Sequence, residues 1–210
     1  VQTCALPISA SNAGRPRTVA IHPDHLLVDG KPTFFYGGDF NYSRTPRRCW
    51  RDRLLKMKAM GMNTVTFYIT WAYHEPFKNQ WEFTGHKDVG AFIDLIHELG
   101  MYVIARLGPF VHGEWINGGL PQWLVDELGP QRCRSNDADY LRYTTNWYEK
   151  ELAIVMPRLI TRGGPIVMLQ LENELGSAGS KGDDIPRGRG HLPRGPLRPP
   201  PSGQIGRAHV

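Results

Sequence analysis

The chain has 210 residues, enough for one domain of ordinary size, and 40% of them are hydrophobic, including six Trp. Its net charge of +5 is concentrated in residues 177–210, where six Lys and Arg outnumber two Asp and leave only +1 for the rest. The organised part of the chain is therefore nearly neutral, and we expect no nucleic-acid partner.

The cysteines and the apolar runs exclude two further classes. Cys4, Cys49 and Cys133 are scattered and include no Cys-x-x-Cys pair, so they indicate neither a disulfide framework nor a zinc ribbon. No apolar run approaches the roughly 18 residues of a membrane-spanning helix, so no membrane partner is expected. The sequence leaves the compartment and the oligomeric state open.

Both ends of the sequence differ from its middle. Residues 1–17 read as a non-native or disordered leader, and VQTCALPIS at the start and QIGRAHV at the end resemble translated sequencing-adapter sequence. Residues 177–203 are rich in Gly, Pro and Arg, a composition that is typical of disorder. We therefore expect one domain over residues 18–176, followed by a disordered or artefactual tail over residues 177–210.

The domain begins with a predicted β-hairpin over residues 18–32, whose turn is Asp29-Gly30. A strand over residues 33–40 follows. The first helix is expected to start with Thr45 as its N-cap and Pro46 in its first turn. Within that helix the spacing of Trp50, Leu54 and Met57 places them on one face.

A join between a helix end, a glycine and a short apolar strand then recurs three times, over residues 57–68, 96–107 and 159–172. Gly61 and Gly100 suit the left-handed position just after a helix. The second helix has apolar residues at i, i+3, i+4 and i+7 between Phe92 and Leu99. The strands are expected at residues 64–69, 102–107 and 165–172. Strands that alternate with helices predict an α/β fold with a parallel sheet.

Polar and aromatic side chains gather directly after each of the four predicted strands. They are Asp39, Asn41 and Tyr42; Tyr68, Trp71, His74 and Glu75; His112, Glu114 and Trp115; and Asn173 and Glu174. A (β/α)8 barrel places its active site at the C-terminal ends of its strands. A doubly wound sheet is the alternative, but its Gly-x-Gly-x-x-Gly signature is absent. The expected fold is a partial (β/α)8 TIM barrel, about its first four βα units, preceded by the small hairpin.

Three long blocks resemble glycoside hydrolase family 35, the β-galactosidase family, in the right order and spacing. They read FYGGDFNYSRTPRRCWRDRLLKMKAMGMNTVTFYITWAYHEP, VIARLGPFVHGEWINGGLPQWL and GGPIVMLQLENELGS. The resemblance covers most of residues 30–176. It implies a retaining exo-glycosidase that hydrolyses terminal β-galactosides, with a carbohydrate substrate and no cofactor.

The resemblance also implies roles for four residues. Glu174 matches the general acid/base, and Asn173 matches the asparagine that contacts the sugar beside the scissile bond. Glu114 matches a glutamate that binds sugar hydroxyls, and Tyr68 matches a tyrosine that lines the same pocket. The family's nucleophile comes from a strand near the end of the barrel, so we expect it to be absent from this fragment and the fragment itself to be inactive.

Two positions depart from the family pattern. Many members have Ser-x-His-Tyr after the first strand, where this chain has residues 39–42 reading DFNY. Many have Cys-Ala before the strand-three glutamate, where this chain has His112 and Gly113. Both departures bear on substrate identity more than on reaction type.

The residue types of strand four also suit glycosidic bond cleavage, independently of the family resemblance. Cleavage of a glycosidic bond requires a protonated carboxyl that donates to the leaving oxygen and a second carboxylate across the sugar. By the period of two, Gln170, Glu172 and Glu174 share one face of strand four, with Glu172 deeper and Glu174 at the rim. As an alternative to sugar binding, Glu114 could have a structural role and form an ion pair with Arg106.

Other functions remain as alternatives. A family 42 type β-galactosidase or an exo-β-glucosaminidase shares the Asn-Glu pair, although the block over residues 118–124 favours family 35. A non-catalytic carbohydrate-binding barrel is the other possibility. The His-x-Glu at His112 and Glu114 also fits zinc deaminases, but the Pro-Cys-x-x-Cys that they need is missing, so no metal is expected.

Overall fold

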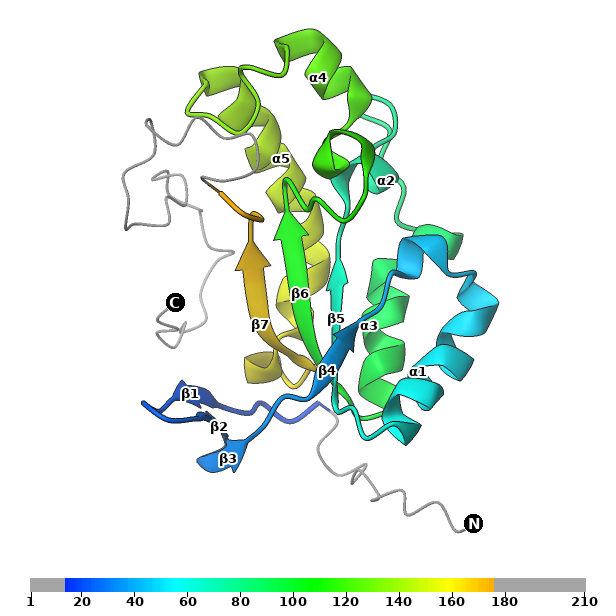
Figure 1. Cartoon of the computed structure of the whole chain (residues 1–210), viewed down its shortest axis with the longest axis vertical. Helices are drawn as coiled ribbons and strands as arrows, with labels where there is room; N and C mark the ends of the chain where they lie inside the picture. The colour runs from blue at the N-terminus through cyan, green and yellow to red at the C-terminus, as the bar shows by residue number, and fades with distance from the viewer. Residues whose placement is uncertain (1–13, 176–210) are drawn as a thin grey trace.

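The computed structural model describes residues 14–175, and its central element is a four-stranded parallel sheet (Figure 1). Each strand pairs with the next in the sequence, and all three pairings are parallel. The strands are β4 (Gly37–Asp39), β5 (Thr64–Tyr68), β6 (Tyr102–Gly108) and β7 (Ile166–Leu171). Residues 1–13 of the predicted leader, which was expected over residues 1–17, and the tail over residues 177–210 lie outside the described residues.

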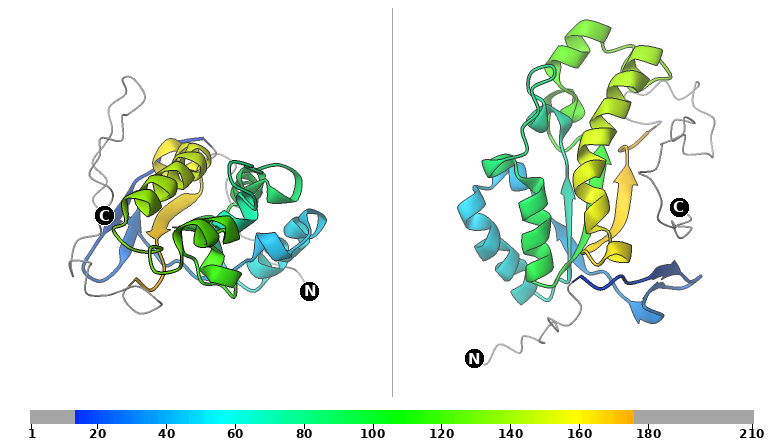
Figure 2. Two further views of the ribbon diagram at one scale, coloured as in Figure 1. Left: turned by 90° about the horizontal axis from the view of Figure 1, so that it is seen from above. Right: turned by 180° about the vertical axis from the view of Figure 1, so that it is seen from behind.

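Helices cover one face of this sheet, as Figure 2 shows from behind. They are α1 (Trp50–Ala59), α3 (Val89–Glu98) and α5 (Ala138–Val155). Two short helices, α2 (Trp71–His74) and α4 (Gln122–Leu128), lie at the end of the sheet toward which the strands point. Four consecutive parallel strands, with the helices that connect them on the outer face, form part of a (β/α)8 barrel, as predicted.

The N-terminal region contains one more strand than predicted. β1 (Val19–Ile21), β2 (Leu26–Val28) and β3 (Lys31–Thr33) form a three-stranded antiparallel sheet. The predicted turn joins β2 to β3, and Asp29 and Gly30 have the positive φ angles of 51° and 73° that a tight hairpin requires. A second turn between β1 and β2 makes two hairpins where one was predicted. The expected strand over residues 33–40 is shorter than predicted: Thr33 ends β3, and the parallel strand β4 comprises Gly37–Asp39.

The predicted start of the first helix is wrong. Pro46 is extended, with ψ of 136°, so the chain makes a 3₁₀ turn over Arg47–Cys49 before α1 begins at Trp50. The Thr45 hydroxyl donates to the carbonyl oxygen of Asn41 at 2.9 Å and caps no helix. The predicted apolar face is confirmed, because Trp50, Leu54 and Met57 are the buried residues of α1.

The joins between helices and strands are as predicted. Gly61 and Gly100 adopt left-handed φ angles of 88° and 67° directly after their helices. Phe92 and Ile96 are fully buried on α3, and Asp88 caps that helix by accepting a hydrogen bond from the Ala91 backbone nitrogen at 2.8 Å. In the described part of the chain, no helix is long and apolar enough to cross a membrane.

Helix α5 fixes the C-terminal end of β6. The indole nitrogen of Trp147 donates to the carbonyl oxygen of Leu107 at 3.2 Å, and the Tyr148 hydroxyl donates to that of Gly108 at 2.7 Å. Trp147 also stacks on Trp71, which follows β5, with 5.7 Å between ring centroids. These contacts connect the outer helix layer to the strand ends where the polar residues gather.

One residue of α5 is expected to make stability depend on pH. Glu151 is fully buried, and neither of its carboxylate oxygens has a hydrogen-bond partner among the described residues. Burial raises the pKa of Glu151 well above its usual 4.5. Above pH 4.5 the Glu151 carboxyl keeps its proton in the folded chain and releases it in the unfolded chain. Stability is therefore lost as pH rises from 4.5 toward the pKa of the folded state.

Replacing Glu151 by Met should therefore stabilise the chain, and by more near pH 7 than near pH 4. Urea unfolding midpoints of the parent and the variant at both pH values measure the stability gained by the substitution. Other titrating groups are present in both proteins, so their contributions cancel in this comparison. A variant that gains nothing near pH 7, or gains equally at both pH values, would contradict a neutral buried carboxyl.

Candidate functional site

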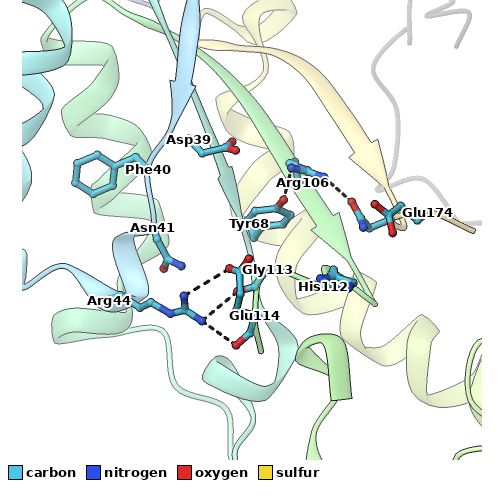
Figure 3. A pocket seen from close by; sticks show the side chains of 11 residues that line it. Asp39, Phe40, Asn41, Arg44, Tyr68, Arg106, His112, Gly113, Glu114 and Glu174 are labelled. Atoms are coloured by element: carbon cyan, nitrogen blue, oxygen red, sulfur yellow. Dashed lines mark hydrogen bonds and ion pairs between the residues drawn. The ribbon is translucent and has the colours of Figure 1, made fainter. Parts of the chain in front are cut away.

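A pocket of about 410 Å³ lies at the C-terminal ends of the parallel strands (Figure 3). Every strand of the parallel sheet, or the loop that follows it, contributes to its lining. The lining residues are Asp39, Phe40, Asn41, Arg44, Tyr68, Arg106, His112, Gly113, Glu114, Asn173 and Glu174. The four residues singled out from the sequence, Tyr68, Glu114, Asn173 and Glu174, thus surround one cavity.

Arg106 is the central hydrogen-bond donor of the pocket. The register of the sheet places Arg106 of β6 beside Tyr68 of β5 and Gln170 of β7. Its guanidinium donates to the Tyr68 hydroxyl through Nη1 and to Asn173 Oδ1 through Nη2, the latter at 2.5 Å, and it lies 4.0 Å from the centroid of the Tyr68 ring. The predicted alternative in which Arg106 pairs with Glu114 is not what the structure has.

Glu114 is held by a different arginine. Arg44, which follows β4, donates from Nη2 to the carbonyl oxygens of Gly113 and Glu114, each at 3.0 Å, and its Nη1 lies 3.8 Å from the Glu114 carboxylate. The Glu114 side chain is 84% exposed. His112, Gly113 and Glu114 all have positive φ angles, so the loop turns tightly and is tied back by Arg44.

Asn173 is buried and is fixed on several sides. Its backbone nitrogen donates to Glu172 Oε2 at 2.9 Å, and its carbonyl oxygen accepts from Arg134 Nη2 at 2.7 Å. Its side-chain oxygen accepts from Arg106. The residue therefore has little freedom to move within the pocket.

The predicted alternation along strand four is wrong beyond Leu171. β7 ends there, and Glu172 and Glu174 have left-handed φ angles of 59° and 51°, so the period of two no longer applies. Glu172 turns toward Arg134 and forms an ion pair with it at 2.7 Å. Glu172 therefore does not sit one pleat below Glu174, and of the two only Glu174 lines the pocket.

Arg134 was missed by the sequence reasoning. It comes from the loop before α5, its side chain is 4% exposed, and its guanidinium lies 3.8 Å from the centroid of the Phe110 ring. No local pattern marks it, since its partners lie almost forty residues further along the chain.

The electrostatics of the pocket converge on Tyr68. Burial raises the pKa of its hydroxyl, Arg106 opposes that rise, and the carboxylates of Asp39, Glu114 and Glu174 add to it. Three acidic groups therefore lie close enough to this hydroxyl to raise its pKa. Residues 14–175 contain no cluster of three or more His, Cys, Asp or Glu placed to hold a metal ion.

The residues after β5 support the pocket from behind. His74 is fully buried, with Nε2 at 2.5 Å from the Tyr42 hydroxyl and Nδ1 at 2.8 Å from the Glu82 carbonyl oxygen. Burial lowers the pKa of His74 to about 4, so it is neutral at physiological pH. Glu75 accepts from the Trp71 indole nitrogen at 2.6 Å. These side chains hold the loop that follows β5 in place.

Comparison with known proteins gives one family. Residues 25–187 match the family model described as Glycosyl hydrolases family 35. The beta-galactosidase of Macaca fascicularis is 45% identical over 159 residues, which are 76% of this chain and 23% of that protein. The beta-galactosidase of Mus musculus is 46% identical over 154 residues, 73% of this chain and 24% of that protein.

A plant relative and a solved structure are also similar to this chain. Beta-galactosidase 8 of Oryza sativa subsp. japonica is 41% identical over 175 residues, 83% of this chain and 26% of that protein. The chain thus spans about a quarter of the length of these relatives. An exo-beta-1,4-mannosidase from Opitutaceae bacterium strain TAV5 has a TM-score of 0.54 over 70% of this chain and 26% of its own, at 19% identity, which supports the fold alone.

Proposed function

Since this chain belongs to glycosyl hydrolases family 35, we propose that its pocket is the acid/base half of a retaining exo-β-galactosidase site. The observation that carries the proposal is the convergence of Tyr68, Glu114, Asn173 and Glu174 on one cavity at the strand ends. The names of the curated relatives support galactose as the sugar. The substrate is a terminal β-galactoside.

Glu174 serves as the general acid and base of this proposal. It protonates the glycosidic oxygen as the bond to the leaving group breaks, and it later removes a proton from the water that hydrolyses the glycosyl-enzyme intermediate. Asn173 hydrogen-bonds the sugar beside the scissile bond, and Glu114 and Tyr68 bind sugar hydroxyls. Each of these groups lines the same cavity.

A retaining enzyme also needs a carboxylate nucleophile about 5–5.5 Å from the acid/base. We assign it to sequence that the relatives have and this chain does not match. Glu172 is unsuited because its carboxylate is engaged by Arg134, and Glu75 because its carboxylate accepts hydrogen bonds from Trp71 and the Asn79 backbone. On this assignment of the nucleophile, the 210-residue chain alone should hydrolyse no galactoside.

A chimera tests this function directly. Residues 25–175 replace the matching segment of the Mus musculus relative, and the purified chimera and the isolated chain are assayed with p-nitrophenyl β-galactoside, β-glucoside, β-mannoside and N-acetyl-β-glucosaminide. The chimera should prefer the galactoside, and the chain should be inactive. Preference for the glucosaminide or mannoside would overturn the substrate assignment. A folded chimera that binds galactose without hydrolysing any substrate would instead indicate a non-catalytic barrel.

A further inference from the structure

We propose that Arg106 is a positioning residue that makes Tyr68 and Asn173 hydrogen-bond donors toward the pocket, so that the site selects sugar oxygens that act as acceptors. The inference rests on the proposed function for the identity of the ligand. It concerns the direction of the hydrogen bonds and adds a residue that the sequence reasoning did not assign to the site.

The contacts of Arg106 carry the first step. Nη1 donates to the Tyr68 hydroxyl and Nη2 donates to Asn173 Oδ1, so one rigid guanidinium connects side chains from β5 and from the loop after β7 (Figure 3). The guanidinium carbon also lies over the Tyr68 ring, 4.0 Å from its centroid. Arginine carries only donors, so both partners must accept from it.

Asn173 is oriented as a consequence. Its Oδ1 accepts from Arg106 and is also 3.5 Å from the Gln170 amide nitrogen, a second donor. Flipping the carboxamide would place its NH₂ group against these donors, so that orientation is excluded while Arg106 is present. The NH₂ group is therefore the part of the amide left to bind a ligand in the pocket that Asn173 lines.

Tyr68 is oriented by the same logic. A phenol has one proton to donate and can also accept. Because Arg106 already donates to the Tyr68 oxygen, the hydroxyl proton is left for an acceptor. Both residues then present donors, and a sugar hydroxyl that meets either of them uses its oxygen as the acceptor.

Fluorinated sugars distinguish this arrangement from a merely structural role of Arg106. A C–F group accepts weakly and cannot donate, whereas a C–H group does neither. The full chain is titrated by NMR with methyl β-galactoside and with analogues in which each hydroxyl in turn is replaced by fluorine or by hydrogen. At positions that meet Tyr68 or Asn173, the fluoro analogue should bind at least about twofold more tightly than the deoxy analogue, since one hydrogen bond contributes about 0.5–1.5 kcal/mol.

Variants at Arg106 test the cause of that preference. In Arg106→Met the preference for fluorine over hydrogen should vanish, because the amide and the hydroxyl are free to turn. Arg106→Lys keeps the charge but lacks the planar fork, so it should restore the preference at one position only. Arg51→Met is the control, since it removes an arginine that pairs with Glu98 on the surface outside the pocket, and it should keep the preference.

A second readout needs no sugar. The side-chain amide signal of Asn173, identified by its loss in Asn173→Asp, should shift in Arg106→Met and stay in place in Arg51→Met. If the parent chain binds no galactoside, the amide signal alone decides the role of Arg106, and the chimera assay decides the sugar. An unshifted amide signal in Arg106→Met, or a fluorine preference that survives in it, would overturn the inference.

Discussion

Replacing Glu174 by Gln in the chimera should lower turnover of a substrate with a poor leaving group, such as lactose, by about 10²–10⁴-fold. An amide cannot donate the proton that a sugar alcohol needs as it departs. A leaving group that is already a weak base, such as dinitrophenolate, departs without such a proton. The glycosylation step of a dinitrophenyl galactoside should therefore be affected far less. The measurement is the ratio of kcat/KM for the two substrates in the parent and the variant.

Glu172→Gln is the matched control for this variant. Glu172 is two residues away but faces Arg134 instead of the pocket. Its replacement should change both substrates by the same factor. Azide should speed the second step of the Glu174→Gln variant with the dinitrophenyl substrate, because azide attacks the intermediate without a base. Equal losses for good and poor leaving groups in the glycosylation step would count against Glu174 as the acid.

Arg134→Met should destabilise the chain by about 3–5 kcal/mol, the usual cost of removing one partner of a buried ion pair. Arg134 donates to the Glu172 carboxylate and to the Asn173 carbonyl oxygen, each at 2.7 Å. The Glu172 side chain is only 17% exposed, so without Arg134 its charge would remain largely buried and unpaired. The loop that carries Asn173 and Glu174 would lose its anchor at the same time.

Urea unfolding of the chain measures this loss. Arg51→Met is the control, because Arg51 pairs with Glu98 on the surface, where both side chains are at least half exposed, and such pairs contribute about 0–1 kcal/mol. In the chimera, Arg134→Met should also lower kcat. If the two variants lost the same stability, the Arg134 ion pair would not anchor the loop.

The fold was predictable where local chemistry decides it. The glycine after each helix and the apolar strand that follows are marked in the sequence, and Gly61 and Gly100 adopt the left-handed angles expected of them. Parallel strands bring their C-terminal ends to one edge, so polar residues after each strand must meet there. That argument was sufficient to place Tyr68 and Asn173 at one cavity.

The hydrogen bonds within the pocket were not predictable, because they depend on the register of the sheet and on contacts between residues that are distant in the sequence. Arg106 meets Tyr68 and Asn173, which lie 38 and 67 residues away. The backbone after β7 leaves the strand conformation at Glu172, which has a positive φ angle. No glycine or proline in that stretch indicates this turn. The start of α1 was misplaced because an extended Pro46 precedes a 3₁₀ turn, which the cap pattern alone does not reveal.

The most direct test of the account is a crystal structure of the chimera with galactose bound. Galactose should occupy the cavity between the ends of β4 and β7, with hydrogen bonds to Tyr68, Glu114 and Asn173. The Glu174 carboxyl should lie within roughly 3.2 Å of the anomeric oxygen, the reach of a proton donor. Galactose bound elsewhere, or bound there with Glu174 turned away from the anomeric oxygen, would contradict the account.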